Sequence, residues 1–268
     1  MIAEIRSSIT AGWVLAKRNI SIQIRDHALG YGWVFLVPAM YALGFVYLKR
    51  EFVADAAASR GNANWEVMQA FCGIMLVQFW LQLVQDMADI VGRNRALMRG
   101  LNIGPSPFVL SVAFEGLLNL GFRIVLILVA LVALGHPFPQ HPSSWVWMGM
   151  SLLVLQFTAY ALGLFLAPWS ALYPDMRKAL QSLALPLMLA TPIFYAPVAD
   201  PERALHWLNL INPLSAPVTA MSYGLQGIPA GVPASSLLVE GLLSFVVIAW
   251  SILQLRWQIP VLLERIGD

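Results

Sequence analysis

The sequence predicts an all-α integral membrane protein with six transmembrane helices, and two observations carry this prediction. Of the 268 residues, 59% are apolar and only 11% are charged, and the mean hydropathy is +0.71. A typical soluble domain is about half apolar and about a quarter charged. The apolar residues also fall in long blocks, without the alternating or helical spacing of a soluble protein. Both observations place the chain in a lipid bilayer.

Six apolar blocks are long enough to cross a membrane. A helix needs roughly 20 apolar residues to cross the hydrocarbon layer, and only a helix satisfies its backbone hydrogen bonds within one segment. The predicted spans cover residues 29–48, 67–85, 108–134, 145–172, 179–196 and 237–255. Pro186 and Pro192 interrupt the fifth block, and Glu240 lies near the start of the sixth. Residues 1–268 show no internal repeat and are predicted to form a single transmembrane domain.

Residues 204–225 form a further apolar stretch that contains Asn209, Asn212, Pro213 and Pro217. Facing lipid, these polar groups and the broken backbone would be costly, but they are tolerated when buried in protein or beside a water-filled cavity. We therefore predict a re-entrant or outer-surface element between the fifth and sixth spans, in place of a seventh span.

The distribution of basic residues predicts that both termini are cytoplasmic. With six spans and an inner N-terminus, the cytoplasmic segments hold 11 of the 16 Lys and Arg residues: Arg6, Lys17, Arg18, Arg25, Arg93, Arg95, Arg99, Arg177, Lys178, Arg256 and Arg265. The outer segments hold Lys49, Arg50, Arg60 and Arg203. This imbalance follows the positive-inside rule, and a seventh span would reverse the side on which the last two arginines lie.

Residues 4–24 are predicted to form an amphipathic helix along the inner membrane surface. Apolar side chains recur every three or four residues, at Ile5, Ile9, Trp13, Ala16 and Ile20. The basic side chains of this segment lie off that stripe. Such a helix either anchors the chain or presents a contact surface to a partner, and the pattern by itself favours the anchor.

The sequence lacks the motifs of the common catalytic sites. A P-loop requires Gly directly before its Lys, whereas Lys17, Lys49 and Lys178 follow Ala, Leu and Arg. The single cysteine, Cys72, lies in an apolar block and the four histidines are scattered, so neither a disulfide framework nor a metal site is expected. The net charge of +2 is too small to indicate a nucleic-acid partner. We expect no catalytic residue, no metal and no cofactor bound by this chain.

Intramembrane charges and aromatic residues are candidates for contact with a transported molecule. Arg123 lies near the middle of the third span, eight positions after Glu115, which places them about 12 Å apart along a helix. We therefore expect each to pair with another helix or with a polar cavity. Arg123 either contacts an anionic group of a substrate or belongs to a buried structural pair. The aromatic residues near the span ends are typical of an interfacial belt, although ring faces also suit sugar rings.

Four short motifs occur in order along the chain. Residues 18–20 read Arg-Asn-Ile and are followed by Leu29-Gly30, Trp33 and Pro38. Residues 173–177 read Tyr-Pro-Asp-Met-Arg, residues 191–195 read Thr-Pro-Ile-Phe-Tyr, and residues 212–214 read Asn-Pro-Leu. In this order on six spans, they resemble the motifs of the type 2 ABC transporter permeases that export capsular polysaccharide, O-antigen or teichoic acid.

The resemblance extends from about residue 5 to the end of the chain, with a few departures. Asn19 stands where the family usually has Asp, and Gln23-Ile24 stand where Arg-Tyr is common. Pro174 replaces the usual Arg of the motif at 173–177, and the run 93–105 matches more loosely. The spacings from Arg18 to Leu-Gly, Trp and Pro all hold.

The resemblance implies a homodimer of this chain that works with two separate ABC ATPase subunits, which bind the ATP and Mg²⁺. It also implies a multi-pass protein of the bacterial inner membrane, with cytoplasmic termini and short outer re-entrant helices within 197–230. The predicted function is that of the transmembrane subunit of an ATP-driven exporter of a lipid-linked polysaccharide, a capsule or O-antigen chain. Membrane lipids surround the subunit, and an envelope-spanning export protein is a further candidate partner.

Two sets of site residues follow from these predictions. The coupling surface toward the ATPase subunits is predicted to comprise Trp13, Lys17, Arg18, Arg93, Arg95, Arg99, Asp175 and Arg177. The basic members have an alternative role, which is to orient the chain by charge. The substrate conduit is predicted to lie between the two copies along the first and fifth spans, with Trp33, Tyr41, Arg123, Tyr160, Trp169, Phe194 and Tyr195 as candidates. Some of these are expected to face lipid or to pack inside the subunit.

Three alternatives remain at this point. An ABC exporter of a small drug or lipid would share the span number and the separate ATPase. A membrane-embedded lipid-modifying transferase would need clustered acids or histidines at one membrane face, and Asp86 with Asp89 is the one such pair in the sequence. We interpret that pair as the inner end of the second span, beside Arg93 and Arg95. A coupling-ion transporter is disfavoured because charged residues within the spans are few.

Overall fold

The chain is helical throughout the part that the computed structural model describes, which comprises residues 2–25, 32–52, 63–101, 104–173, 175–197, 200–228 and 233–265. In these residues all regular secondary structure is α-helical, as the sequence predicts. The helices are α1 (Ile2–Arg25), α2 (Gly32–Phe52), α3 (Ala63–Ala88), α4 (Ile90–Leu101), α5 (Ser106–Ala133), α6 (Pro142–Leu172), α7 (Met176–Ser182), α8 (Ala184–Ala190), α9 (Ala204–Ile211), α10 (Ser215–Leu225) and α11 (Ala234–Arg265).

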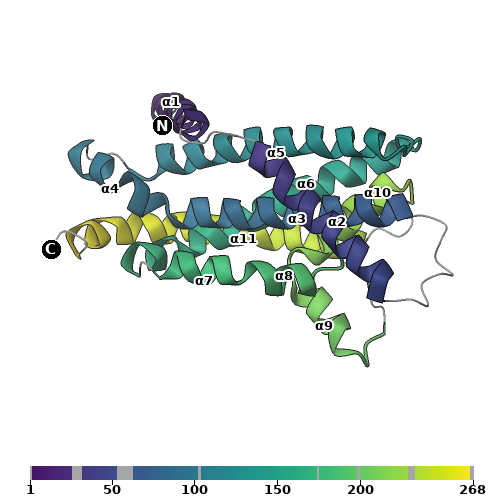
Figure 1. Cartoon of the computed structure of the whole chain (residues 1–268). Helices are drawn as coiled ribbons and strands as arrows, with labels where there is room; N and C mark the ends of the chain where they lie inside the picture. The colour runs from purple at the N-terminus through teal and green to yellow at the C-terminus, as the bar shows by residue number, and fades with distance from the viewer. Residues whose placement is uncertain are drawn as a thin grey trace.

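Four segments of the described chain are long and apolar enough to cross a membrane: Trp65–Gly100, Ser106–Ala133, Pro142–Leu172 and Ala234–Ile259. They cover the second, third, fourth and sixth predicted spans to within one residue. The corresponding helices α3, α5, α6 and α11 lie lengthwise beside one another (Figure 1), and α6 packs against both α3 and α11. The chain is therefore a multi-pass membrane protein.

Helix α2 contains most of the first predicted span, residues 29–48. Residues 29–31 lie outside the described part of the chain, and with them the Leu-Gly pair of the N-terminal motif. One side of α2 packs against α3, and the other side carries described side chains that are open to the surroundings. Met40, Leu43 and Tyr47 on that open side are 60–67% exposed. An apolar face of this kind is available to lipid or to a second membrane subunit.

The fifth predicted span differs from a single helix over 179–196. Helical structure begins a few residues earlier and divides at Leu183 into α7 and α8, which continue in the same general direction in Figure 1. Because Pro186 lacks an N–H group, it cannot donate to the carbonyl oxygen of Ser182, which weakens the helix at this point. The helix ends at Ala190, and an irregular turn replaces the predicted last turn and a half.

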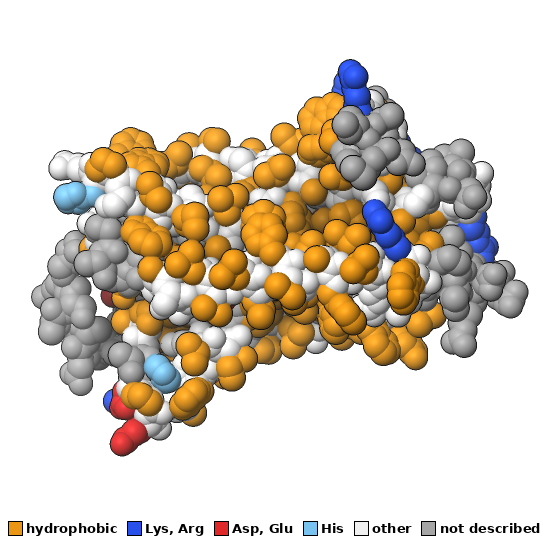
Figure 2. Space-filling model, turned by 180° about the vertical axis from the view of Figure 1, so that it is seen from behind, with side chains coloured by type: hydrophobic (Ala, Val, Ile, Leu, Met, Phe, Trp, Pro, Cys, Tyr) orange, Lys and Arg blue, Asp and Glu red, His pale blue; other side chains and the backbone are white. Residues whose placement is uncertain are grey.

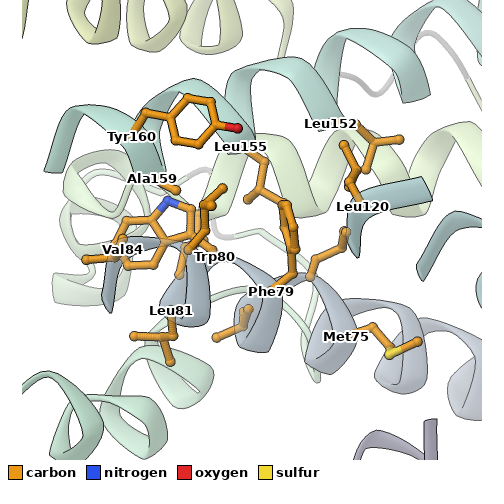
Figure 3. Packing of buried hydrophobic residues seen from close by; sticks show 14 of the residues in the cluster. Met75, Phe79, Trp80, Leu81, Val84, Leu120, Leu152, Leu155, Ala159 and Tyr160 are labelled. Carbon is orange, nitrogen blue, oxygen red and sulfur yellow. The ribbon is translucent and has the colours of Figure 1, made fainter. Parts of the chain in front are cut away.

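Helix α3 lies at the centre of the packing and contacts α2, α5, α6, α8 and α10. Figure 3 shows its buried side chains interdigitating with those of α5 and α6. The indole N–H group of Trp80 donates to Oγ1 of Thr158 at 3.0 Å. The hydroxyl group of Tyr160 donates to the carbonyl oxygen of Ala113 at 3.0 Å. Both aromatic residues thus bury their rings while their polar atoms have partners.

Glycine allows the closest contacts between helices in this core. At Gly163 on α6, an added Cβ atom would lie 2.5 Å from Cβ of Met87 and 2.8 Å from the carbonyl oxygen of Val84 on α3. At Gly224 on α10, an added Cβ would lie 2.5 Å from Cγ of Met148 on α6. Small residues are enriched between membrane helices because they let the backbones approach. These two glycines therefore set the distances of α3 and α10 from α6.

Helices α9 and α10 occupy the segment between the fifth and sixth predicted spans. Residues 215–222 of α10 are all buried, and α10 packs mainly against α6. Asn212 lies between the two helices and attaches them to the turn after α8: its Nδ2 donates to Oγ1 of Thr191 at 2.9 Å, and its Oδ1 accepts from the backbone N–H of Leu214 at 3.1 Å. The Asn-Pro-Leu and Thr-Pro-Ile-Phe-Tyr motifs are thus bonded together, and Asn212 is satisfied within the protein, as predicted.

Asn212→Ala is expected to lower the free energy of unfolding by about 1–3 kcal/mol, because the Thr191 hydroxyl and the Leu214 amide each lose a buried partner. Thermal unfolding of the purified protein in detergent measures the effect. Thr10→Ala is the control, since the Thr10 hydroxyl makes an exposed local bond to the carbonyl of Arg6. Equal melting temperatures for the two variants would contradict the role given to Asn212.

Helix α1 lies across the bundle. In Figure 1 it is seen nearly end-on, whereas the neighbouring α5 is seen lengthwise. The two helices pack closely at Gly12, where an added Cβ would lie 2.8 Å from Cβ of Leu110 and 3.0 Å from the carbonyl oxygen of Pro107. The ring of Trp13 meets the ring of Phe114 edge-on, with 5.5 Å between centroids. This orientation is the one expected for a helix along the membrane surface.

The outside of the bundle is hydrophobic along most of its length. Figure 2 shows hydrophobic side chains across the visible face, with most of the visible Lys and Arg side chains toward one end. On α11, Leu242, Val246 and Trp250 are 65–69% exposed. Soluble monomers rarely expose such extended apolar surfaces. This surface has the composition expected for contact with lipid.

Candidate functional site

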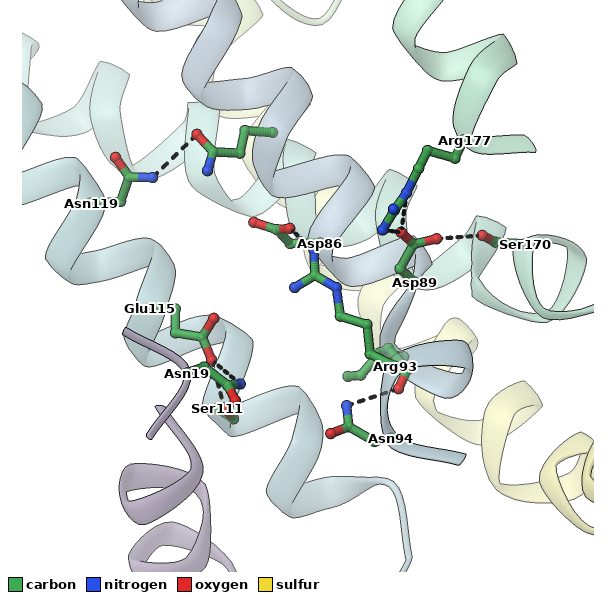
Figure 4. A network of polar contacts seen from close by, with 12 residues as sticks. Asn19, Asp86, Asp89, Arg93, Asn94, Ser111, Glu115, Asn119, Ser170 and Arg177 are labelled. Carbon is green, nitrogen blue, oxygen red and sulfur yellow. Dashed lines mark hydrogen bonds and ion pairs between the residues drawn. The ribbon is translucent and has the colours of Figure 1, made fainter. Parts of the chain in front are cut away.

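The end of the bundle that carries the predicted coupling residues contains a network of charges (Figure 4). Asp86 forms an ion pair with Arg93. Asp89, where α3 joins α4, accepts a hydrogen bond from Nε of Arg177 at 2.7 Å and one from the Ser170 hydroxyl at 2.9 Å. The two aspartate side chains are 18% and 15% exposed, and the arginines are 36% and 51% exposed. The network therefore holds two guanidinium groups at the surface.

The predicted coupling residues lie on three elements at this same end. They are Trp13, Lys17 and Arg18 on α1, Arg93, Arg95 and Arg99 on α4, and Asp175 and Arg177 at the start of α7. Figure 1 places α1, α4 and the start of α7 toward one end of the bundle. Arg95 is partly buried, and the other side chains are exposed. The structure brings these residues to one end, and their contact with ATPase subunits stays a prediction.

Glu115 attaches α1 to α5. Its Oε1 accepts hydrogen bonds from Nδ2 of Asn19 and from the hydroxyl of Ser111, both at 2.8 Å. Glu115 thus pairs with another helix, as the sequence predicted. An amide at position 19 suits this contact, because it donates to the carboxylate of Glu115, whereas a second carboxylate would repel it.

Asn19→Asp is expected to loosen α1 from α5, because it replaces a hydrogen-bond donor by a negative charge beside Glu115. The expected loss is about 1–3 kcal/mol, measured by thermal unfolding and by the rate of protease cleavage within α1. Adding Glu115→Gln should restore the contact in the double variant, since the new amide can donate to the carboxylate introduced on α1. Failure of this rescue would show that Asn19 does not act through Glu115.

The predicted conduit residues divide into two groups. Trp33 and Tyr41 on α2 and Trp169 on α6 are about half exposed, and Phe194 and Tyr195 in the turn after α8 are partly buried. These five remain conduit candidates. Tyr160, on α6, is 9% exposed, and its hydroxyl group donates to the carbonyl oxygen of Ala113 on α5. This burial favours a packing role for Tyr160 in the subunit interior, and its part in a conduit stays a prediction.

Arg123 is held inside the subunit and is 3% exposed. Its Nη1 donates to the carbonyl oxygen of Met75 at 2.7 Å, and its Nη2 donates to Oε1 of Gln82 at 3.2 Å. Its Nε donates to Oδ1 of Asn119 at 3.2 Å, and its guanidinium group lies 5.7 Å from the ring centroid of Phe79. These contacts join α5 to α3. They favour the structural interpretation of Arg123 over contact with a passing substrate.

Arg123→Met is expected to fold and to keep most transport, because Met conserves much of the volume and removes a buried charge. Gln82 and Asn119 keep each other as partners at 3.3 Å. Arg123→Ala should instead lower stability by about 2–5 kcal/mol through the cavity it leaves. Thermal unfolding and transport by the folded variants measure both effects. A stable Arg123→Met variant without transport would assign Arg123 to the cargo.

Several polar partners were not predicted from the sequence. Gln82 and Asn119 hold Arg123, and Asn209 on α9 accepts a hydrogen bond from the Tyr195 hydroxyl at 2.9 Å. For two of these residues the sequence contains a sign of a buried polar contact. Gln82 and Asn119 are amides within long apolar runs, and Asn119 precedes Arg123 by one helical turn. The partner helix of each, however, depends on how the spans pack.

Comparisons with known proteins identify the family of this chain. Residues 10–225, from α1 to α10, match the family described as ABC-2 type transporter. The O-antigen export system permease protein RfbA of Myxococcus xanthus is 24% identical over 209 residues, which cover 77% of this chain and 76% of that protein. The chain belongs to the ABC-2 type transporter family, and it is a membrane subunit of an ABC transporter, a transport component without a catalytic role of its own.

Proposed function

We propose that this chain is the transmembrane subunit of an exporter that moves a lipid-linked polysaccharide, a capsule or O-antigen chain, across the bacterial inner membrane. The observation that carries this choice of cargo is the similarity, over about three quarters of both chains, to an O-antigen export permease. The ordered motifs at residues 18–38, 173–177, 191–195 and 212–214 support the same choice.

The proposed topology has six crossings and cytoplasmic termini. Helix α2 makes the first crossing, and α7 with α8 makes most of the fifth. Residues 176–190 extend about 22 Å as a helix, so the turn at 191–195 completes this crossing. Helices α9 and α10 re-enter the membrane from the outer side. The positive-inside rule assigns the end with α1, α4 and the start of α7 to the cytoplasm, because the basic residues gather there.

The working unit is a homodimer with two ATPase subunits, which bind ATP and Mg²⁺. ATP binding draws the ATPase subunits together, and they press on the coupling residues of α1, α4 and α7. The bond between Arg177 and Asp89 transmits this force to the junction of α3 and α4. The polymer passes between the two copies along α2 and α7–α8, where Trp33, Tyr41 and Tyr195 offer ring faces to sugars. An envelope-spanning protein is a further candidate partner on the outer side.

The same architecture would serve an exporter of a small drug or lipid, and gene neighbourhood distinguishes the two: glycosyltransferase genes accompany polysaccharide export. The lipid-modifying transferase has less support. Its candidate acids, Asp86 and Asp89, are each paired with an arginine in the network that connects α3, α4 and α7.

Depletion of the gene product tests the proposal. Lipid-linked polymer should accumulate inside the cell while surface glycan falls, and unchanged surface glycan would refute polysaccharide export. In vitro, the purified partner ATPase should hydrolyse ATP faster once it is reconstituted with this chain. A partner variant unable to hydrolyse ATP is the control. If this chain alone hydrolysed nucleotide, it would not be a subunit that depends on a separate ATPase.

A further inference from the structure

Two cavities adjoin at the end of the bundle opposite the charged network. One, of about 370 Å³, lies between the start of α3, the turn after α8 and the C-terminal half of α10. The other, of about 230 Å³, lies between α9, α10 and the start of α11. They share four lining residues, Pro192, Pro197, Thr219 and Tyr223. Together they form one cleft, here called the outer cleft.

The lining of the outer cleft mixes aromatic rings with uncharged hydrogen-bonding groups. Phe194, Tyr195 and Tyr223 supply the rings, and Gln69, Ser222 and Gln226 supply amides and a hydroxyl. The Tyr195 ring is held in place, because its hydroxyl group lies 2.9 Å from Oδ1 of Asn209 and 2.8 Å from the carbonyl oxygen of Ala190. Neither cavity is lined by a described Lys or Arg residue, whereas Glu66 and Glu240 each line one.

Three polar atoms of residues along the smaller cavity are buried without a hydrogen-bond partner among the described residues. They are Nδ2 of Asn209, Oγ of Ser215 and Oε2 of Glu240. Buried polar atoms are nearly always hydrogen-bonded, so such a group calls for water or a ligand. An amide nitrogen donates only, a carboxylate oxygen accepts, and a hydroxyl does both. A ligand rich in hydroxyl groups offers both donors and acceptors to these three side chains when they turn toward the cavity.

We propose that the outer cleft binds an uncharged, hydroxyl-rich sugar unit of the exported chain. The proposal rests on the function proposed above and adds a site to it. Ring faces stack on the apolar side of a sugar, and the amides, hydroxyls and carboxyl groups bond to its edges. An acyl chain would leave these polar groups unpaired. An anionic unit would find no Lys or Arg among the described lining residues, where His206 is the one basic side chain and Glu66 and Glu240 are the acids. This lining suits a neutral saccharide better than an anionic one.

Photo-crosslinking in cells tests this site with the natural cargo. A benzophenone amino acid in place of Tyr223, which lines both cavities, should form an adduct with the exported glycan, detected as a heterogeneous increase in mass that a glycan antibody recognises. The same amino acid in place of Leu242 is the control, because that side chain is 69% exposed on the apolar face of α11. Equal glycan adducts at both positions would refute a defined site.

Variants of the outer cleft provide a second test of the sugar site. Glu240→Gln should slow the appearance of surface glycan about 3- to 10-fold at an unchanged amount of protein in the membrane. Glu202→Gln removes an exposed carboxylate in the loop before α9 and should leave export unchanged. Equal export rates for the two variants would contradict a role of Glu240 in holding the sugar.

The outcomes separate the two proposals. If depletion of the protein abolishes surface glycan but position 223 gives no glycan adduct, the outer cleft is not a sugar site and the exporter remains. If depletion leaves surface glycan unchanged, polysaccharide export itself is refuted, and the sugar site with it.

Discussion

Gly163→Leu is expected to abolish the accumulation of folded protein in the membrane. Even the first added carbon atom would lie 2.5 Å from Cβ of Met87 and 2.8 Å from the carbonyl oxygen of Val84. The second of these is a backbone atom of α3, so α6 must move as a whole to relieve the contact. Because α6 also packs against α10 and α11, this movement would disturb the helices on both of its sides.

The same helix offers a matched control. Gly149 lies on α6 with no atom within 4 Å of its added Cβ, so Gly149→Leu should leave the amount of folded protein near the wild-type level. Gly163→Ala should give an intermediate loss of about 1–3 kcal/mol. Membrane fractionation and fluorescence-detected size exclusion in detergent measure the amount of monodisperse protein. Similar yields for Gly163→Leu and Gly149→Leu would mean that α3 and α6 are not in contact in the membrane.

The features that could be predicted from the sequence are those that depend on solvent preference. Four of the six predicted spans lie within apolar helical segments of the structure, apart from one residue at the end of the third span, because an uncharged block of about 20 residues has few other stable conformations. The amphipathic stripe through Ile9 and Trp13 likewise predicts α1. Asn212 and Pro213 marked residues 204–225 as unfit to cross the bilayer, and the structure divides this segment there into α9 and α10.

The remaining features depend on contacts between segments that are distant in the sequence. Arg123 had no partner within reach on its own span other than Asn119, and its remaining partners, Met75 and Gln82, come from α3. The register between α3 and α5 decides these contacts, and hydropathy does not encode that register. The division of the fifth span at Leu183 has two causes. One is local, because Pro186 lacks a backbone N–H group, and the other is the packing of α8 against α3.

The second large effect is expected at the bond between Arg177 and Asp89. Arg177→Asp should reduce transport more than tenfold, because it removes two charge-assisted hydrogen bonds and places a carboxylate beside a carboxylate that is 15% exposed. Hydrogen bonds to charged groups contribute about 1.5–3 kcal/mol each, so the start of α7 should detach from the junction of α3 and α4. The protein should still insert, since no apolar contact of the core is changed.

Lys178→Asp is the matched control, since Lys178 is 84% exposed and its nearest acid, Asp175, is 3.8 Å away and equally open to water. The same change of charge one residue later should alter transport less than twofold if the bond to Asp89 is what matters. Combining Arg177→Asp with Asp89→Arg re-creates an ion pair and should recover part of the activity. The recovery is incomplete because the Ser170 hydroxyl, which donates to Asp89 in the wild type, loses its acceptor and faces a guanidinium group. ATP-driven transport and ATPase stimulation by the reconstituted complex measure coupling. If Arg177→Asp and Lys178→Asp behave alike, the surface charge of α7 is sufficient and the link to α3 transmits nothing.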